Sequence, residues 1–259
     1  MKSYFNRILH GENSPKKWEL AIWWAARTVL IATLVHAIFF NKAEDHTKMA
    51  LQVAGNMLGQ FVWEILQISP KKSFLRHIPA YIQDISAPAL IGGSLFGAYL
   101  NFYYSAPVLD IVMHTVGGVA CTLIGYEIFT AMEKRDVEQG DTYSSVSIIV
   151  FGACCFSFVA GNAWELFEFT ADQFNPGHPG DAQHWSYELA VQAIEDAKAL
   201  GKTIDLPNFI AHRDPVRYGV IDTMEDMICN TAGGIIGWVL LKLRPYHHLD
   251  RVKGKVKTK

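Results

Sequence analysis

The sequence has almost no surplus of charge of either sign, and it contains few cysteines. It holds 23 lysines and arginines against 25 aspartates and glutamates, which gives a net charge of −2. Nucleic-acid-binding proteins usually carry a basic surplus, so no nucleic-acid partner is expected. The four cysteines lie in apolar runs without metal-ligand spacing, which argues against a disulfide framework and against a cysteine-based zinc site.

Two further patterns are missing. The chain has no G-x-S-x-G motif, so covalent serine catalysis is disfavoured. The first residues lack an apolar core followed by a small-residue cleavage site, so we expect no cleaved signal peptide. The first apolar run is therefore expected to be a retained membrane anchor.

Apolar residues, in contrast, are abundant and gathered in long runs. They make up half of the sequence, and polar segments separate the runs. This pattern predicts an all-α, polytopic integral membrane protein with a single membrane domain over residues 1–259. The six predicted spans cover about residues 18–40, 49–68, 85–104, 108–131, 146–169 and 218–241. Residues 170–217 form a long extracytoplasmic loop, with an amphipathic helical pattern from Ser186 to Leu200, that is expected to cover the outer face.

Lysine and arginine counts predict the orientation of these spans. The N-terminal segment, the two loops on its side of the membrane and the C-terminal tail hold four, three, two and seven of these residues. The opposite side holds two in its first loop, none in its second and four in the long loop. Cytoplasmic segments carry the excess of positive charge, so both termini are expected in the cytoplasm. The predicted location is a plasma membrane, the inner membrane of a bacterium.

The last predicted span carries polar and small residues along one helical face. At about 100° per residue they fall on one narrow stripe. The stripe consists of Asp222, Asp226, Asn230, Gly233 and Gly237. Acids inside a span are costly unless they are paired, protonated or bound to a cation, so they indicate a functional site.

Two other predicted spans carry acids near the same outer end. Asp110 and His114 are four residues apart in the fourth span, and Glu165 and Glu168 are three apart in the fifth. The topology brings these ends to the same depth as the acids of the sixth span. We therefore expect one acidic cluster at the extracytoplasmic face. The alternative for each group is a solvated helix end at the membrane surface.

The number of carboxylates in this cluster limits which partners could offset its negative charge. Many carboxylates in a low dielectric cannot all ionise unless a divalent metal, shared protons or a cationic substrate offsets their charge. Oxygen-rich ligation with one imidazole suits Mg, Mn, Ca or Fe better than a structural zinc ion. The predicted metal ligands are Asp110, His114, Glu165, Asp222 and Asp226. Glu165, Glu168 and His114 are the predicted catalytic acid–base groups, and Asn230 is expected to support them.

A second set of charged residues lies in the predicted inner halves of the spans. Arg27 is in the middle of the first span, and Glu64 and Glu127 lie in the second and fourth. A structural ion pair between helices is the favoured interpretation. Gln60 and Asp84 are candidates for the same network.

The motifs of the last three spans resemble those of the VanZ-like membrane proteins and the related YjdF-type bacterial inner-membrane proteins. The matching motifs are Asp110-x3-His114 with Gly117, Glu165-x2-Glu168, and Asp226-x3-Asn230-x2-Gly233-x3-Gly237. VanZ-like sequences often have Gln at the position of Glu168 and a short loop in place of residues 170–217, so the YjdF type fits better. The resemblance implies an envelope-facing polytopic membrane protein.

Three hypotheses for the function follow. The leading one is a metal-dependent site that binds or acts on a lipid-linked or envelope molecule, with membrane lipid as its surroundings. The second is a proton- or cation-coupled transporter, with a polar path through Arg27, Glu64 and Glu127. The third is a non-catalytic membrane adaptor, in which the acidic cluster is only a solvated rim.

Overall fold

The computed structural model describes residues 14–40, 46–70, 72–100, 102, 108–142, 144–173, 198–201 and 215–243. The main elements within these ranges are all helices, as the sequence predicts. They are α2 (Lys17–Phe39), α3 (His46–Gly59), α4 (Val62–Ile68), the 3-10 helix η1 (Phe74–His77), α5 (Tyr81–Ile91), the π-helix η2 (Gly92–Tyr99), α7 (Val108–Glu138), α8 (Val146–Gln173) and α11 (Pro215–Leu243). The helix predicted from Ser186 to Leu200 lies almost entirely outside the described residues, as does most of the predicted loop.

Four of the described helices are long and apolar enough to cross a membrane. They are α2, α7, the Val146–Thr170 part of α8 and the Asp222–Leu243 part of α11. These four correspond to the predicted first, fourth, fifth and sixth spans. The second and third predicted spans are not continuous α-helices, because each consists of two shorter helical pieces.

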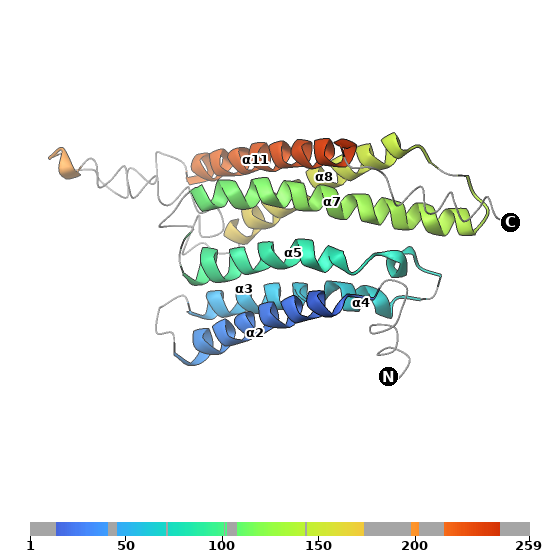
Figure 1. Cartoon of the computed structure of the whole chain (residues 1–259). Coiled ribbons are helices and arrows are strands. Elements are labelled where there is room, and N and C mark those ends of the chain that lie inside the picture. The colour runs from blue at the N-terminus through green and yellow to red at the C-terminus, as the bar shows by residue number, and fades with distance from the viewer. Residues whose placement is uncertain are drawn as a thin grey trace.

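The helices form two groups that lie side by side (Figure 1). One group contains α2, the α3–α4 pair, and α5 with η2, and the other contains α7, α8 and α11. Helix α5 lies next to α7. Buried Ile78 and Ile82 pack with Ala131 of α7 and join the two groups.

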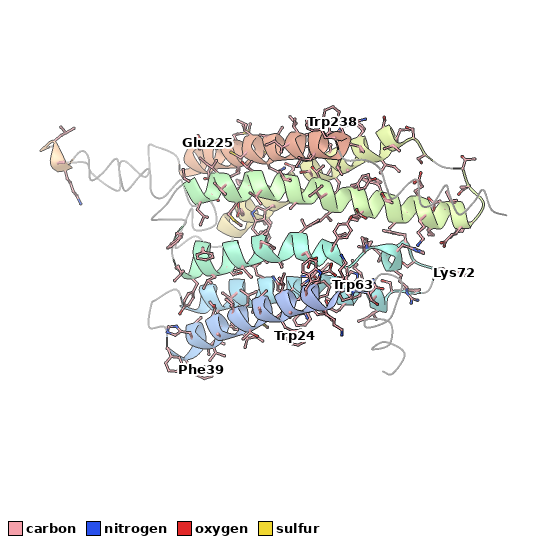
Figure 2. The ribbon with its side chains drawn as sticks, viewed as in Figure 1. Trp24, Phe39, Trp63, Lys72, Glu225 and Trp238 are labelled. Carbon is pink, nitrogen blue, oxygen red and sulfur yellow. The ribbon has the colours of Figure 1, made fainter. Side chains whose placement is uncertain are left out.

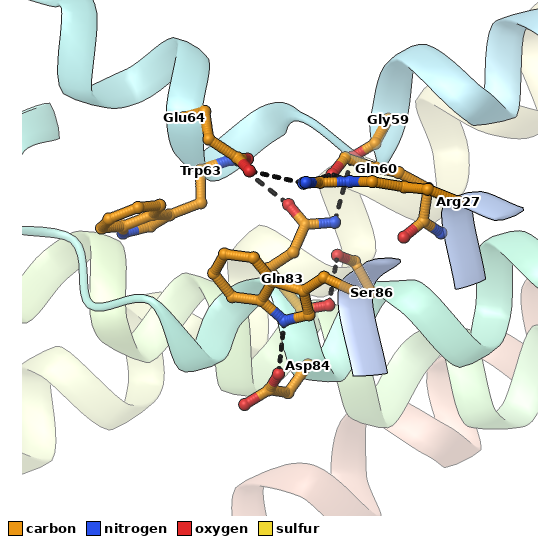
Figure 3. A network of polar contacts seen from close by, with 9 residues as sticks. Arg27, Gly59, Gln60, Trp63, Glu64, Gln83, Asp84 and Ser86 are labelled. Atoms are coloured by element: carbon orange, nitrogen blue, oxygen red, sulfur yellow. Dashed lines mark hydrogen bonds and ion pairs between the residues drawn. The ribbon is translucent and has the colours of Figure 1, made fainter. Parts of the chain in front are cut away.

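The break between α3 and α4 has an identifiable cause. A continuous helix would bond the Trp63 N–H to the Gly59 carbonyl oxygen. Instead, Trp63 N donates to Gln83 Oε1 over 3.3 Å, and Gln83 Nε2 donates to the Gly59 oxygen over 3.3 Å (Figure 3). The side-chain amide of Gln83, on α5, is thus inserted between the two backbone groups. Glycine favours such a break because it is a poor helix former.

Arg27 donates hydrogen bonds to the carbonyl oxygen of Gln60, the residue that follows Gly59 at the break. Its Nε and Nη2 donate to the Gln60 oxygen over 3.2 and 2.5 Å. Nη2 also contacts Glu64 Oε1 at 2.5 Å, which confirms the predicted ion pair.

Gln60 and Asp84 lie in the same region as this ion pair. The Gln60 amide donates to the Ala87 oxygen, and Asp84 accepts from the Trp23 indole over 2.6 Å. Glu127 is buried on α7.

Replacing Gln83 with leucine is expected to destabilise the fold by about 2–4 kcal/mol, because it leaves the Gly59 carbonyl and the Trp63 N–H without their partners in an apolar interior. Unfolding of the detergent-purified protein by a denaturant measures the effect. Gln139→Leu, at an exposed position after α7, is the matched control and should change the free energy of unfolding by about 0.5 kcal/mol or less. Equal stability of the two variants would contradict this account of the break.

The direction of the helices decides which ends meet. Helices α7 and α11 begin, and α2 and α8 end, at the same end of the bundle (Figure 1). Figure 2 shows Phe39 and Glu225 at this end, and Lys72 at the other. The three acid-bearing segments predicted from the sequence therefore lie at one end of the α7–α8–α11 group.

Candidate functional site

Three helices contribute polar side chains to one cluster. Helix α7 places Asp110 and His114 one turn apart near its start, and their side chains share a face. Helix α8 carries Glu165 and Glu168 near its end, and α11 carries Asp222 and Asp226. The helices pack against one another along their length, so these pairs face a common interior. We call the set Asp110, His114, Glu165, Glu168, Asp222 and Asp226 the acidic cluster.

His114 lies between carboxylates from all three helices. Its Nε2 is 3.5 Å from Asp110 Oδ1 and 3.5 Å from Asp226 Oδ2. Its Nδ1 is 3.5 Å from Glu165 Oε1. Good N–H···O hydrogen bonds measure about 2.7–3.2 Å, so these contacts are longer than tight hydrogen bonds, and they are ion pairs when His114 is protonated. One imidazole thereby links the acids of α7, α8 and α11.

The cluster is withdrawn from the surface of the protein. Glu165 and Asp222 are each only 2% exposed, Asp226 is 4% exposed and Asp110 is 6% exposed. His114 and Glu168 are half-buried. Both carboxylate oxygens of Glu165 are buried, and neither makes a hydrogen bond of standard geometry within the described residues. Buried oxygens in that state need a proton donor or a cation.

The ligand atoms are close enough together to surround an ion. His114, Glu165, Glu168 and Asp226 each offer one atom, and these atoms lie within 4.8 Å of one another. Asp110, Asp222 and Asp226 form a second such set. Ligands on opposite sides of one Mg²⁺ or Ca²⁺ ion lie about 4–5 Å apart, so each set has the dimensions of a coordination shell.

Among the described residues, Glu225 is an acid near this end that does not join the cluster. Glu225 lies on α11 one residue before Asp226, but it is exposed. The side chain of Asp172 lies outside the described residues, as do His212 and Arg213. The structure therefore separates Asp226 from Glu225 by helical phase, as the period of α11 requires.

Asn230 lies one turn below Asp226 and ties the helices together beneath the cluster. Its Nδ2 donates to the Ser157 carbonyl of α8 over 3.2 Å, and Ser157 Oγ donates to the Gly118 carbonyl of α7 over 2.9 Å. The Asn230 side chain occupies the space that a Cβ at Gly161 would fill. This arrangement gives Asn230 a supporting position.

Glycines allow α7 and α11 to approach closely at the same level. A Cβ at Gly118 would overlap the Asn230 main-chain carbonyl, and one at Gly233 would overlap the Thr115 carbonyl. Gly237 lies against Thr122, so the glycine stripe of α11 faces α7 as its spacing indicates. Gly117, the glycine of the family motif, has open space around its Cβ position, whereas Gly118 makes the close contact with α11.

Sequence reasoning missed two residues of this support. Ser157 is fully buried, and Gly161 lies against Asn230. They are four residues apart, which is the spacing of small residues at close helix contacts in membranes. That spacing was the signal available in the sequence.

The neighbouring glycines of α7 provide a direct test of this packing. Gly118→Ala is expected to destabilise the protein by about 1–3 kcal/mol, because the new methyl group meets backbone atoms of α11. Gly117→Ala adds the same methyl group to open space, so it should be neutral or stabilising by up to about 1 kcal/mol. Denaturant unfolding of the two variants measures the difference. Equal effects would show that α7 and α11 are not in close contact there.

Comparisons with known proteins identify the family. Residues 22–246 match the family described as "Predicted membrane protein (DUF2238)". An uncharacterised protein of Thermotoga maritima is 25% identical over 124 residues, which are 47% of this chain and 61% of the relative. The match thus spans less than two thirds of that relative, and no solved structure matches the chain. The finer resemblance to VanZ-like and YjdF-type proteins stays a prediction. The family match covers most of the sequence and four helices are suited to crossing a membrane, so the chain is a multi-pass membrane protein that belongs to the DUF2238 family.

Proposed function

We propose that the acidic cluster binds a divalent cation and that the protein uses this site to bind or act on a lipid-linked or envelope molecule. The site would face the extracytoplasmic side of a bacterial plasma membrane. One observation carries the proposal: His114 contacts carboxylates from three helices, and neither buried oxygen of Glu165 beside it makes a hydrogen bond of standard geometry within the described residues.

The charge of the cluster favours a cation. Five carboxylates, from Asp110, Glu165, Glu168, Asp222 and Asp226, share a small volume with a single histidine. A protonated His114 supplies only one positive charge to this volume. Anions at low dielectric repel one another strongly unless a counter-charge is present. A divalent cation would supply that charge and would be coordinated by the Glu165 oxygens, which make no hydrogen bond of standard geometry within the described residues.

The donor set indicates which cations fit. Carboxylate oxygens dominate, with one imidazole nitrogen and no cysteine among the clustered residues. Such a set suits Mg, Mn, Ca or Fe. His114 can give one ring nitrogen to the ion while the other N–H donates to a carboxylate, which fixes the ring orientation.

We assign different roles, metal ligation and proton exchange, to different residues of the acidic cluster. Asp110, Glu165, Asp222 and Asp226 would hold the ion through their carboxylate oxygens. Glu168 belongs to the set around His114 and is less completely buried as a residue than Glu165, so we assign it the exchange of a proton with a substrate. When bound, a divalent cation would supply Lewis-acid polarisation of a substrate oxygen.

Aromatic residues beside the cluster favour a lipid-linked partner. Trp164 and Phe167 flank Glu165 on α8, are 49% and 61% exposed, and have ring centroids 5.6 Å apart. Exposed Trp rings concentrate at the level of lipid headgroups. The acidic cluster would therefore lie at the depth of a headgroup, on the side with fewer lysines and arginines.

A second candidate function is proton- or cation-coupled transport. Glu64 favours it, because its Oε2 is buried in the first helix group and makes no hydrogen bond within the described part of the chain. In that case, Glu64 would exchange protons during turnover and Glu64→Gln would abolish transport without unfolding the protein. In the metal-site proposal the same change affects stability alone.

Metal content, measured by mass spectrometry on detergent-purified protein, tests the proposal. The wild type is expected to hold a near-stoichiometric divalent metal that is lost from the folded Asp222→Asn, Asp226→Asn double variant. Glu225→Gln removes an exposed acid from the same helix and should retain the metal. Absence of metal from the wild type, even after reconstitution, would contradict the proposal. If the folded double variant still performed the protein's role in the cell, the adaptor hypothesis would be favoured instead.

A further inference from the structure

We infer that the acidic cluster is a two-cation centre in which Asp226 bridges the two ions. This inference rests on the proposed function and specifies its stoichiometry and ligand sets. Two groups of ligand atoms exist, each within 4.8 Å, and Asp226 is the member that both groups share.

The first set combines the three helices around His114. Glu165 and Glu168 come from α8, His114 from α7 and Asp226 from α11. Asp226 Oδ2 is 3.5 Å from His114 Nε2, and Glu165 Oε1 is 3.5 Å from His114 Nδ1. Glu165 is only 2% exposed, and its oxygens make no hydrogen bond of standard geometry within the described residues. Its oxygens belong to this set, and a cation there would coordinate them in addition to their contact with His114.

The second set consists of carboxylates alone. Asp110 comes from α7, and Asp222 and Asp226 come from α11, one turn apart. All three are buried, with exposures between 2% and 6%. Asp110 Oδ1 also faces His114 Nε2 at 3.5 Å, so the two sets lie against each other.

A bridging carboxylate fits this arrangement. Asp226 has two oxygens, and each can bind a different ion. Enzymes with two bridged metals hold the ions about 3.5–4 Å apart. That separation is compatible with two ligand sets that share one side chain and contact each other through His114.

Charge balance favours the second ion. The five carboxylates of the cluster carry five negative charges when ionised. One divalent cation with a neutral His114 leaves three of them uncompensated, whereas two cations leave one. Repulsion among buried anions grows quickly with their number at low dielectric, so the second cation stabilises the folded cluster further.

Titration with Mn²⁺ tests this inference on the full chain in detergent. We expect two Mn²⁺ per wild-type chain by equilibrium dialysis and metal analysis. We also expect an electron paramagnetic resonance spectrum with the broadening of two coupled ions. Asp222→Asn should bind one ion with an uncoupled spectrum, and Glu225→Gln should retain two.

The outcomes separate this inference from the proposed function. One uncoupled Mn²⁺ in the wild type would overturn the two-cation centre and leave the single-cation site standing. No Mn²⁺ would overturn both. Two ions without coupling, or two ions retained by folded Asp222→Asn, would place the second ion elsewhere and overturn the bridged centre. The wild-type spectrum alone distinguishes two coupled ions from a single ion, so the test holds even if a variant fails to fold.

Discussion

Replacing Arg27 with methionine is expected to lower the free energy of unfolding by about 3–5 kcal/mol. Arg27 is 2% exposed, contacts Glu64 at 2.5 Å and donates twice to the Gln60 carbonyl at the break between α3 and α4. Its loss leaves a buried carboxylate without its counter-charge and a backbone oxygen without donors. The guanidinium also lies 4.0 Å from the centre of the Phe61 ring, and that contact disappears as well.

Denaturant unfolding with matched controls measures this effect. Arg135→Met removes a partly exposed arginine that pairs with its neighbour Asp136, so it should cost about 0.5 kcal/mol or less. The Arg27→Met, Glu64→Met double variant removes both charges and should recover much of the lost stability. A double variant as unstable as Arg27→Met alone would show that the ion pair is not the reason for the effect.

Asp226→Asn is expected to have opposite effects on stability with and without a divalent cation. In a chelator, the change removes one of five clustered carboxylates, so the variant should be at least as stable as the wild type. With Mn²⁺ at about 100 times its Kd, the wild type should gain about 2.7 kcal/mol through linkage for each ion that it binds. The variant should lose most of that gain, because it lacks a ligand common to both sets and its affinity should fall about a hundredfold or more.

Thermal unfolding in chelator and in increasing Mn²⁺ measures both parts of this prediction. Glu225→Gln, on the exposed side of α11, should respond to Mn²⁺ as the wild type does. A Mn²⁺-dependent gain that persists unchanged in Asp226→Asn would mean that the ion binds outside the acidic cluster.

The helical periodicity of the sequence was enough to identify the helices that carry the cluster. In α11, Asp222, Asp226 and Asn230 are buried and Glu225 is exposed, as a period of 3.6 residues requires. The sequence also predicts the spans on α2, α7, α8 and α11, because each is a long apolar run with few charges. Local pattern determines both features, so a sequence alone can reveal them.

The break between α3 and α4 could not be predicted in the same way. It depends on Gln83, which lies 24 residues after Gly59 and supplies both replacement partners, and on Arg27, which lies 33 residues before Gln60. Periodicity within residues 49–68 contains no sign of either contact. The contact of Gly118, rather than Gly117, likewise depends on how α11 is rotated against α7. Tertiary contacts decide such features.

Anomalous scattering from Mn²⁺ in crystals of the full chain would locate the proposed cation site directly. We expect an anomalous peak between α7, α8 and α11, about 2.0–2.3 Å from a His114 nitrogen and from carboxylate oxygens of Glu165 and Asp226. A peak only at the protein surface, or no peak at a concentration that saturates binding in solution, would contradict this expectation.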